Sequence, residues 1–167
     1  MAVVGPGGAG KSTFATELGR LTDLPVIHLD HHYWRPGWVE TSAAEWRPVQ
    51  ERLIAGDRWV VDGNYGGTFD VRFERADTVI VLEPSRLACL LGALRRSLPN
   101  RGVAIQADGC PERIDLAFLR WIWRYPRDSR PRLDGALERH SGHLDVIELQ
   151  SRSAADAFLR KLATAGP

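Results

Sequence analysis

Residues 5–12 read Gly5-Pro6-Gly7-Gly8-Ala9-Gly10-Lys11-Ser12, which matches the pattern G-x-x-x-x-G-K-[ST] at every fixed position. The stretch follows an apolar run at residues 2–4 and leads into an amphipathic segment that starts at Thr13, so its context is strand, loop and helix. Glycines allow the backbone to turn its amides inward around a phosphate, and the following helix directs the positive end of its dipole at the same anion. The pattern therefore predicts a site for a nucleoside triphosphate.

We expect ATP and Mg²⁺ to bind at this loop. Lys11 would contact the β- and γ-phosphates, and the Ser12 hydroxyl would ligate the metal ion. The residues of the loop that are predicted to bind the nucleotide are Gly5, Gly7, Gly8, Ala9, Gly10, Lys11, Ser12 and Thr13. The alternative is a glycine-rich turn that carries a lysine by chance, and the match in the correct context argues against it.

The composition is that of a globular chain that folds as one domain. The chain has 167 residues, of which 44% are hydrophobic and 26% charged, and its formal net charge is +1. This near-neutral charge argues against a dedicated nucleic-acid partner. No apolar run reaches the ~20 residues that span a bilayer, and the N-terminal residues lack the pattern of an export signal. We therefore expect a cytoplasmic location and no membrane partner.

Apolar runs alternate with segments of helical periodicity along the chain, which is typical of an α/β protein. The expected strands are residues 3–4, 24–29, 58–62, 78–82 and 144–149. The expected helices after the first are residues 43–55, 86–98, 113–125 (stopped or kinked at Pro126) and a C-terminal helix capped by Ser153. This layout predicts a doubly wound parallel sheet of about five strands flanked by helices, with ligands at the carboxyl ends of the strands.

Two carboxylates follow predicted strands near the glycine-rich loop. Asp62 closes an apolar strand and precedes Gly63, which is the pattern of a Walker B carboxylate that holds Mg²⁺ directly or through water. An aspartate that caps a tight turn is the alternative for Asp62. Asp30 closes the second strand, where it could orient or deprotonate the hydroxyl of a phosphoryl acceptor, and a helix cap is its alternative role.

Polar and aromatic residues around these acids are candidate contacts for the acceptor, together with Asp30 itself: His28, Tyr33, Trp34, Asn64 and Tyr65. Asn64 and Tyr65 lie in a glycine-rich loop directly after a strand, where α/β folds commonly place substrate contacts. Tyr33 and Trp34 could stack on a planar acceptor or pack in the core. Both readings of the aromatic pair stay open at the level of the sequence.

Arginines are concentrated in residues 95–132, which contain nine arginines and only four acidic residues. On a helix over 113–125, Arg113, Arg120 and Arg124 would fall within about 40° of one another. Arginines neutralise the charge of a transferring phosphoryl group, so we expect Arg120 and Arg124 to act in catalysis and Arg95 and Arg113 to bind the nucleotide. A solvated helix face is the alternative.

The chain resembles the small adenylate-kinase-like P-loop proteins of bacteria that are often labelled DNA topology modulation proteins. The matching segments are residues 5–13, 28–30, 33–38, 59–65, 75–78, 109–113 and 118–124. The resemblance implies a fold similar to that of the nucleoside monophosphate kinases. It implies a single P-loop domain over residues 1–167, with an acceptor-side insertion at about 31–57 and a short helical, arginine-rich lid region at about 99–132.

The leading hypothesis is an ATP-dependent phosphotransferase that acts on a small hydroxylated or nucleotide acceptor. Lys11, Asp30, Arg120 and Arg124 would be its catalytic residues, and Ser12 and Asp62 would hold the metal ion. The alternative is a nucleotide-dependent regulatory ATPase that associates with DNA. The protein would act as a monomer or a homodimer.

Overall fold

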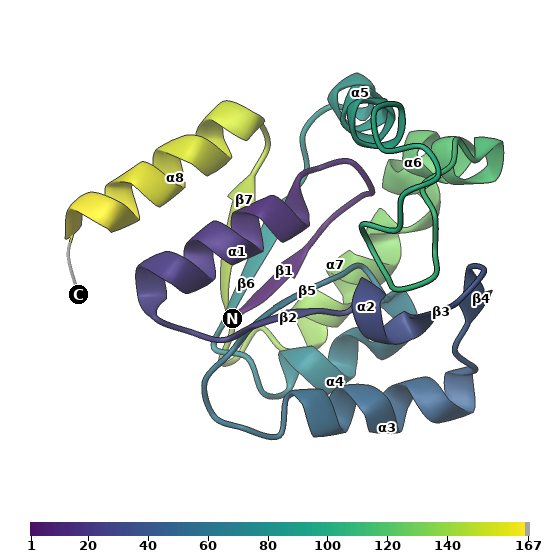
Figure 1. Cartoon of the computed structure of the whole chain (residues 1–167). Coiled ribbons are helices and arrows are strands. Elements are labelled where there is room, and N and C mark those ends of the chain that lie inside the picture. Colours follow the sequence, from purple (N-terminus) through teal and green to yellow (C-terminus); the bar gives the residue numbers. More distant parts are fainter. Residues whose placement is uncertain (166–167) are drawn as a thin grey trace.

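A computed structural model of the chain describes residues 1–165 as a sheet of five parallel strands between two layers of helices (Figure 1). The strands are β1 (Ala2–Val4), β2 (Val26–His28), β5 (Val60–Asp62), β6 (Thr78–Leu82) and β7 (Asp145–Leu149). Their order across the sheet is β2-β5-β1-β6-β7, and each neighbouring pair is parallel. The predicted doubly wound α/β architecture is therefore confirmed.

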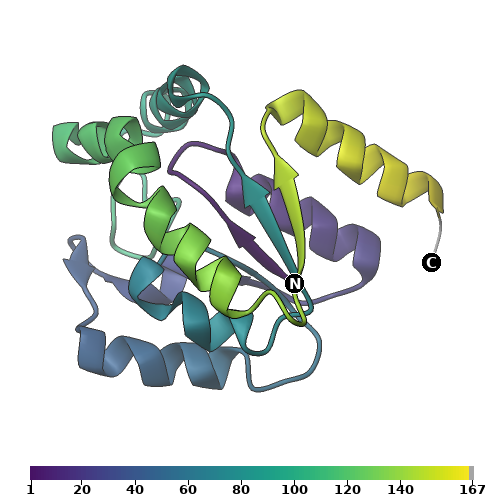
Figure 2. The same cartoon turned by 180° about the vertical axis from the view of Figure 1, so that it is seen from behind.

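One layer of helices consists of α3 (Ala43–Leu53), α4 (Phe69–Phe73) and α7 (Arg130–Arg139). Phe69 of α4 and Leu133 of α7 are buried in the same apolar cluster as Val4 of the sheet. Figure 2 shows α7 lying across this face of the strands.

The other layer consists of α1 (Lys11–Thr22) and α8 (Arg152–Ala165), with α5 (Arg86–Ser97) and α6 (Leu116–Asp128) beside the glycine-rich loop. Phe14 of α1 is buried in a second cluster with Val3 of the sheet, whereas Ala2 and Val4 belong to the first. Successive side chains of a strand point to opposite faces, so the continuous apolar run at the start of the chain serves both layers.

The segment between β2 and α3 contains three elements that the sequence did not predict. A short helix, α2 (Asp30–Tyr33), leads into a hairpin of β3 (Trp34–Arg35) and β4 (Val39–Glu40). Both residues in the turn of the hairpin, Gly37 and Trp38, have positive φ, and φ of Trp38 is 64°. The hairpin lies beside the carboxyl end of β2, so it borders the region where ligands bind in such folds.

Several expected boundaries differ from the structure. The strand expected at 24–29 covers only Val26–His28, and the one at 58–62 only Val60–Asp62. The helix expected at 113–125 runs from Leu116 to Asp128, because the side chain of Asp115 caps it by accepting from the amides of Ala117 (2.8 Å) and Phe118 (3.3 Å).

These differences bear on two predictions. Arg113 precedes α6, so the expected helical stripe of three arginines is wrong. Pro126 lies inside the helix, so of the two expected effects, a stop or a kink, the stop is excluded. At the C-terminal helix, Ser151 and not Ser153 caps the first turn, since its hydroxyl accepts from the amide of Ala154 (3.0 Å). No helix within residues 1–165 is long and apolar enough to cross a bilayer.

Candidate active site

The glycine-rich loop between β1 and α1 adopts a conformation that glycine favours. Gly8 has φ of 72° and Gly10 has φ of 95°, both in the left-handed region. A Cβ at Gly8 would lie 2.0 Å from the carbonyl oxygen of Cys89, so the loop packs tightly on α5. The amides of Gly8, Gly10 and Lys11 have no hydrogen-bond acceptor within residues 1–165. Such unpaired amides at a helix start fit the phosphates of a nucleotide.

Lys11 begins α1 and lies at this loop. Its ammonium group donates to the carbonyl oxygen of Pro6 at 2.9 Å. Burial lowers the pKa of Lys11, and the nearby carboxylates of Asp30 and Asp62 oppose that shift. The lysine therefore lies close enough to both acids for their charges to act on it.

Ser12 and Asp62 meet at the carboxyl end of the sheet. The Ser12 hydroxyl donates to Oδ2 of Asp62 at 2.8 Å, and Oδ1 of Asp62 lies 2.6 Å from Nδ1 of His28. Asp62 is buried, and its hydrogen bond raises the pKa of His28. His28 thus contacts the carboxylate expected to hold the metal.

The donor atoms of this pair fit Mg²⁺. A hydroxyl and a carboxylate supply hard oxygen ligands, and Mg²⁺ commonly binds through one or two such groups together with substrate phosphates. Within the described part of the chain, no cluster of three or more histidine, cysteine or acidic side chains could hold a metal by itself. Ser12 and Asp62 would hold the ion beside the phosphates.

Asp30 begins α2, and its carboxylate faces the same end of the sheet. Oδ1 of Asp30 accepts a hydrogen bond of 2.5 Å from the hydroxyl of Tyr65. Burial raises the pKa of Tyr65, so the phenol stays protonated and remains a donor at neutral pH. Tyr65 therefore orients the carboxylate of Asp30. The sequence predicted Tyr65 as a substrate contact and did not indicate this role.

Asn64 links three parts of the site. Its Oδ1 accepts from the amide of Gly5 at 3.3 Å and from the hydroxyl of Tyr125 in α6 at 3.1 Å. Asn64 lines the cavity. Its amide oxygen accepts both hydrogen bonds and thereby connects the glycine-rich loop to α6.

Arg72 of α4 supports the loop after β5, although the sequence did not identify it as a site residue. The guanidinium is completely buried and donates to the carbonyl oxygens of Gly63 (2.7 Å) and Tyr65 (3.0 Å). It also lies 5.1 Å from the centre of the Phe69 ring, and burial lowers its pKa to about 10. The loop that carries Asn64 and Tyr65 is therefore held in place by a buried cation.

A cavity of about 2190 Å³ joins these groups. One part is lined by the glycine-rich loop, and the other by the hairpin, α3 and the loop after β5. The aromatic residues along the second part are Tyr33, Trp34, Trp38, Trp46 and Tyr65. The rings of Tyr33, Trp46 and Tyr65 lie 4.5 to 5.0 Å apart, so Tyr33 both packs against its neighbours and faces the cavity.

The predicted arginines separate into two groups. Arg113 lines the cavity, whereas Arg95, Arg120 and Arg124 are not among its lining residues. Phe118 and Trp121 line the cavity from α6 instead. Arg120 and Arg124 belong to the same helix but do not line the cavity. Arg124 forms an ion pair with Asp128 at 2.7 Å.

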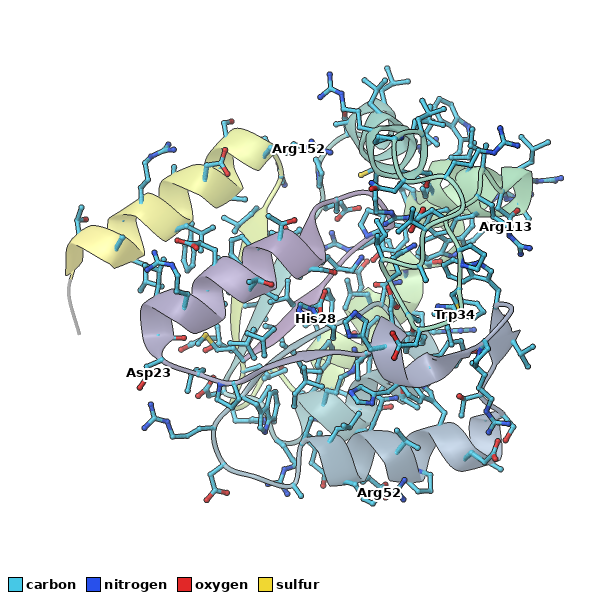
Figure 3. All side chains as sticks on the ribbon, in the orientation of Figure 1. Asp23, His28, Trp34, Arg52, Arg113 and Arg152 are labelled. Atoms are coloured by element: carbon cyan, nitrogen blue, oxygen red, sulfur yellow. The ribbon has the colours of Figure 1, made fainter. Side chains whose placement is uncertain are left out.

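Three further arginines, Arg47, Arg96 and Arg152, line the cavity without having been predicted as site residues. Arg152 begins α8 and donates to the carbonyl oxygen of Gly8 at 3.1 Å, so it touches the glycine-rich loop from 144 residues away in sequence. Arg96 stands over the ring of Phe118 and lies 3.4 Å from Glu112. Figure 3 shows Arg152 at the start of α8, well apart from Arg113 near α6.

The segment between α5 and α6 folds over the cavity and is joined to the hairpin. The amide of Gly37 donates to Gly109 (2.8 Å), and the indole of Trp38 donates to the carbonyl oxygen of Pro111 (2.9 Å). The thiol of Cys110 donates to the carbonyl oxygen of Arg35 at 3.1 Å. This segment, which belongs to the lid region predicted from the sequence, thus packs against the hairpin.

Comparisons with known proteins find solved structures of similar fold. No protein-family model matches the sequence, and no curated protein matches it either. The structure of shikimate kinase from Acinetobacter baumannii, in complex with shikimate, is similar to this chain with a TM-score of 0.58 and 16% identity, over 98% of this chain and 90% of that one.

Two other shikimate kinases are similar. The enzyme from Aquifex aeolicus gives a TM-score of 0.54 at 12% identity and covers 98% of this chain and 94% of its own. The enzyme from Bacteroides thetaiotaomicron gives 0.51 at 14%, over 98% and 95%. These likenesses show that the chain shares its α/β fold with the solved shikimate kinases, and they do not confirm the DNA topology label.

Proposed function

We propose that the protein is a kinase that uses ATP and Mg²⁺ to phosphorylate the hydroxyl group of a small acceptor. One observation carries the proposal: the Ser12–Asp62 pair at the phosphate loop and the Tyr65–Asp30 pair border the same cavity. The first pair suits a metal–triphosphate complex, and the second suits a hydroxyl that loses its proton.

The residues divide the reaction between them. The amides of the loop and Lys11 would bind the phosphates, and Ser12 and Asp62 would hold Mg²⁺, which neutralises charge on the transferring group. Asp30, oriented by Tyr65, would accept the proton of the acceptor hydroxyl as its oxygen bonds to the γ-phosphorus and the bond to ADP breaks. Arg96 and Arg152 line the cavity, where they could stabilise the phosphoryl charge.

The test is transfer of labelled γ-phosphoryl from ATP across a panel of nucleosides, nucleotides, sugars and amino sugars, with and without EDTA. We expect at least one compound to be phosphorylated, and transfer to stop when EDTA removes Mg²⁺. ATP hydrolysis without transfer to any compound would contradict the proposal and favour a regulatory ATPase.

A further inference from the structure

The acceptor part of the cavity contains two carboxylates that lack a cationic partner. Oδ1 of Asp30 accepts from Tyr65, and Oε2 of Glu40 accepts from the hydroxyl of Tyr33 at 3.0 Å. Within residues 1–165, neither acid forms an ion pair, and the second oxygen of each has no hydrogen-bond donor. The charge of Asp30 acts on Lys11, which the proposed function assigns to the phosphates.

The arginines of the same region already have acidic partners. Arg47 of α3 lies 3.5 Å from Glu51, and Arg113 lies 3.6 Å from Asp115. Both arginines line the cavity, and Arg47 does so from α3. Their charge is offset within the protein, so the region attracts cations more strongly than anions.

The aromatic wall adds to this preference. Tyr33, Trp46 and Tyr65 form a cluster whose ring centres lie 4.5 to 5.0 Å apart, and the Trp34 ring lies 5.0 Å from Tyr33. The face of an aromatic ring is electrically negative and attracts ammonium groups. The aromatic rings and the unpaired carboxylates of this wall therefore both attract a positively charged group.

We propose that the acceptor carries an amine, protonated at neutral pH, close to the hydroxyl that receives the phosphoryl group. This inference rests on the proposed kinase function and names its substrate class. The hydroxyl faces Asp30 and the ammonium group faces Glu40 and the aromatic wall. Phosphoryl transfer is to oxygen: the hydroxyl proton goes to Asp30, a new P–O bond forms at the acceptor, and ADP leaves with the electrons of the broken bond.

Matched acceptors of different charge test this assignment. The set consists of glucosamine, glucose and glucuronate, and of 5′-amino-5′-deoxyadenosine, adenosine and adenosine monophosphate, each assayed for kcat/KM with ATP and Mg²⁺. A hydrogen bond to a charged group corresponds to roughly a 10- to 100-fold preference, so we expect each amine to exceed its neutral counterpart by that factor. Transfer to an anionic member that equals or exceeds transfer to the amine would overturn the inference.

Two variants distinguish a direct contact with the Glu40 carboxylate from an effect of the net charge of the protein. Glu40→Gln should reduce the ratio of amine to neutral acceptor by about tenfold, mainly through KM of the amine. Glu74→Gln removes the same charge at an exposed position outside the cavity and should leave the ratio unchanged. Equal effects of the two variants would contradict a direct contact with Glu40.

Failure of the kinase function gives a different result from failure of this inference. If no compound accepts phosphoryl, the proposed function is contradicted, and binding then decides the charge preference. Calorimetric titration of the protein with a non-hydrolysable ATP analogue and each sugar should show tighter binding of glucosamine than of glucose or glucuronate. Tighter binding of glucuronate would overturn the inference.

Discussion

At the residue scale, Gly8 and Gly10 test how the phosphate loop is held. Both have positive φ, but a Cβ at Gly8 would clash with the Cys89 carbonyl, whereas a Cβ at Gly10 would meet nothing within 4 Å. We expect Gly10→Ala to lower the free energy of unfolding by about 1–2 kcal/mol, from backbone strain alone. Gly8→Ala should cost a further ~1–3 kcal/mol because of overpacking. Equal losses in urea unfolding would show that the loop does not pack on α5 as described.

Arg72 gives a second prediction at this scale. Arg72→Met leaves the carbonyl oxygens of Gly63 and Tyr65 without their donor, which costs about 1–3 kcal/mol for each buried group. Arg72→Lys keeps one donor and should give an intermediate loss. Transfer activity should fall with both, because the loop that orients Asp30 loses its support.

Arg75→Met is the matched control for Arg72. Arg75 also donates to two carbonyl oxygens, those of Ala55 and Gly56, but it is exposed. Water can replace its hydrogen bonds, so the change in unfolding free energy should stay below about 1 kcal/mol with activity unaffected. A loss as large as that of Arg72→Met would argue against the supporting role of the buried guanidinium.

At the element scale, Asp70 joins α4 to α7. Its Oδ1 accepts from Arg139 at 2.9 Å and lies 3.0 Å from Nε2 of His140. Partial burial opposes ionisation of Asp70, but these partners outweigh it and lower its pKa. A depressed carboxyl pKa contributes stability above the unfolded pKa of about 3.9, and this contribution is lost as the pH falls through the folded pKa.

Asp70→Asn should therefore destabilise the protein at pH 7 and not at acid pH. The loss at pH 7 should be no more than about 1 kcal/mol because the pair is largely exposed to solvent. Chemical denaturation of both proteins at pH 7 and below pH 3 measures the difference. A loss that persists unchanged in acid would assign the effect to packing and not to charge.

The elements show what the sequence could and could not predict. The apolar runs at 78–82 and the loop at 5–12 carried enough local signal to place a strand and the phosphate loop. The start of α6 was misplaced although aspartate is a preferred N-cap residue: the carboxylate of Asp115 accepts from the amide of Ala117 and starts the helix after it. With Arg113 outside the helix, the proposed catalytic role of Arg120 and Arg124 lacked the geometry on which it was based.

The parts of the site that sequence reasoning missed depend on long-range contacts. Arg152 touches Gly8, and Asn64 joins Gly5 to Tyr125, across wide gaps in the chain. No periodicity or motif within a window of residues reports such pairs. The high arginine content also hid Arg72, since a buried arginine has no local pattern that distinguishes it from an exposed one.

At the scale of the whole molecule, we expect the packing of the predicted lid segment to depend on its junction with the hairpin. Trp38→Phe removes the indole donor to Pro111, which is worth about 1 kcal/mol. We expect amide hydrogen exchange at residues 107–112 to accelerate roughly fivefold with little change in Tm. Trp59→Phe removes a comparable local donor to Gly56 and should not change exchange in the lid. Unchanged exchange in Trp38→Phe would show that this hydrogen bond does not hold the lid.

In the proposed function, the phosphate loop and Asp30 form the two halves of one transfer site. The most direct measurement is phosphoryl transfer from ATP to the best acceptor by Asp30→Asn, together with its affinity for ATP. We predict an ATP Kd within about twofold of the original protein and a loss of at least about 100-fold in kcat, in line with removal of a catalytic base. Transfer at the original rate in Asp30→Asn would contradict the account.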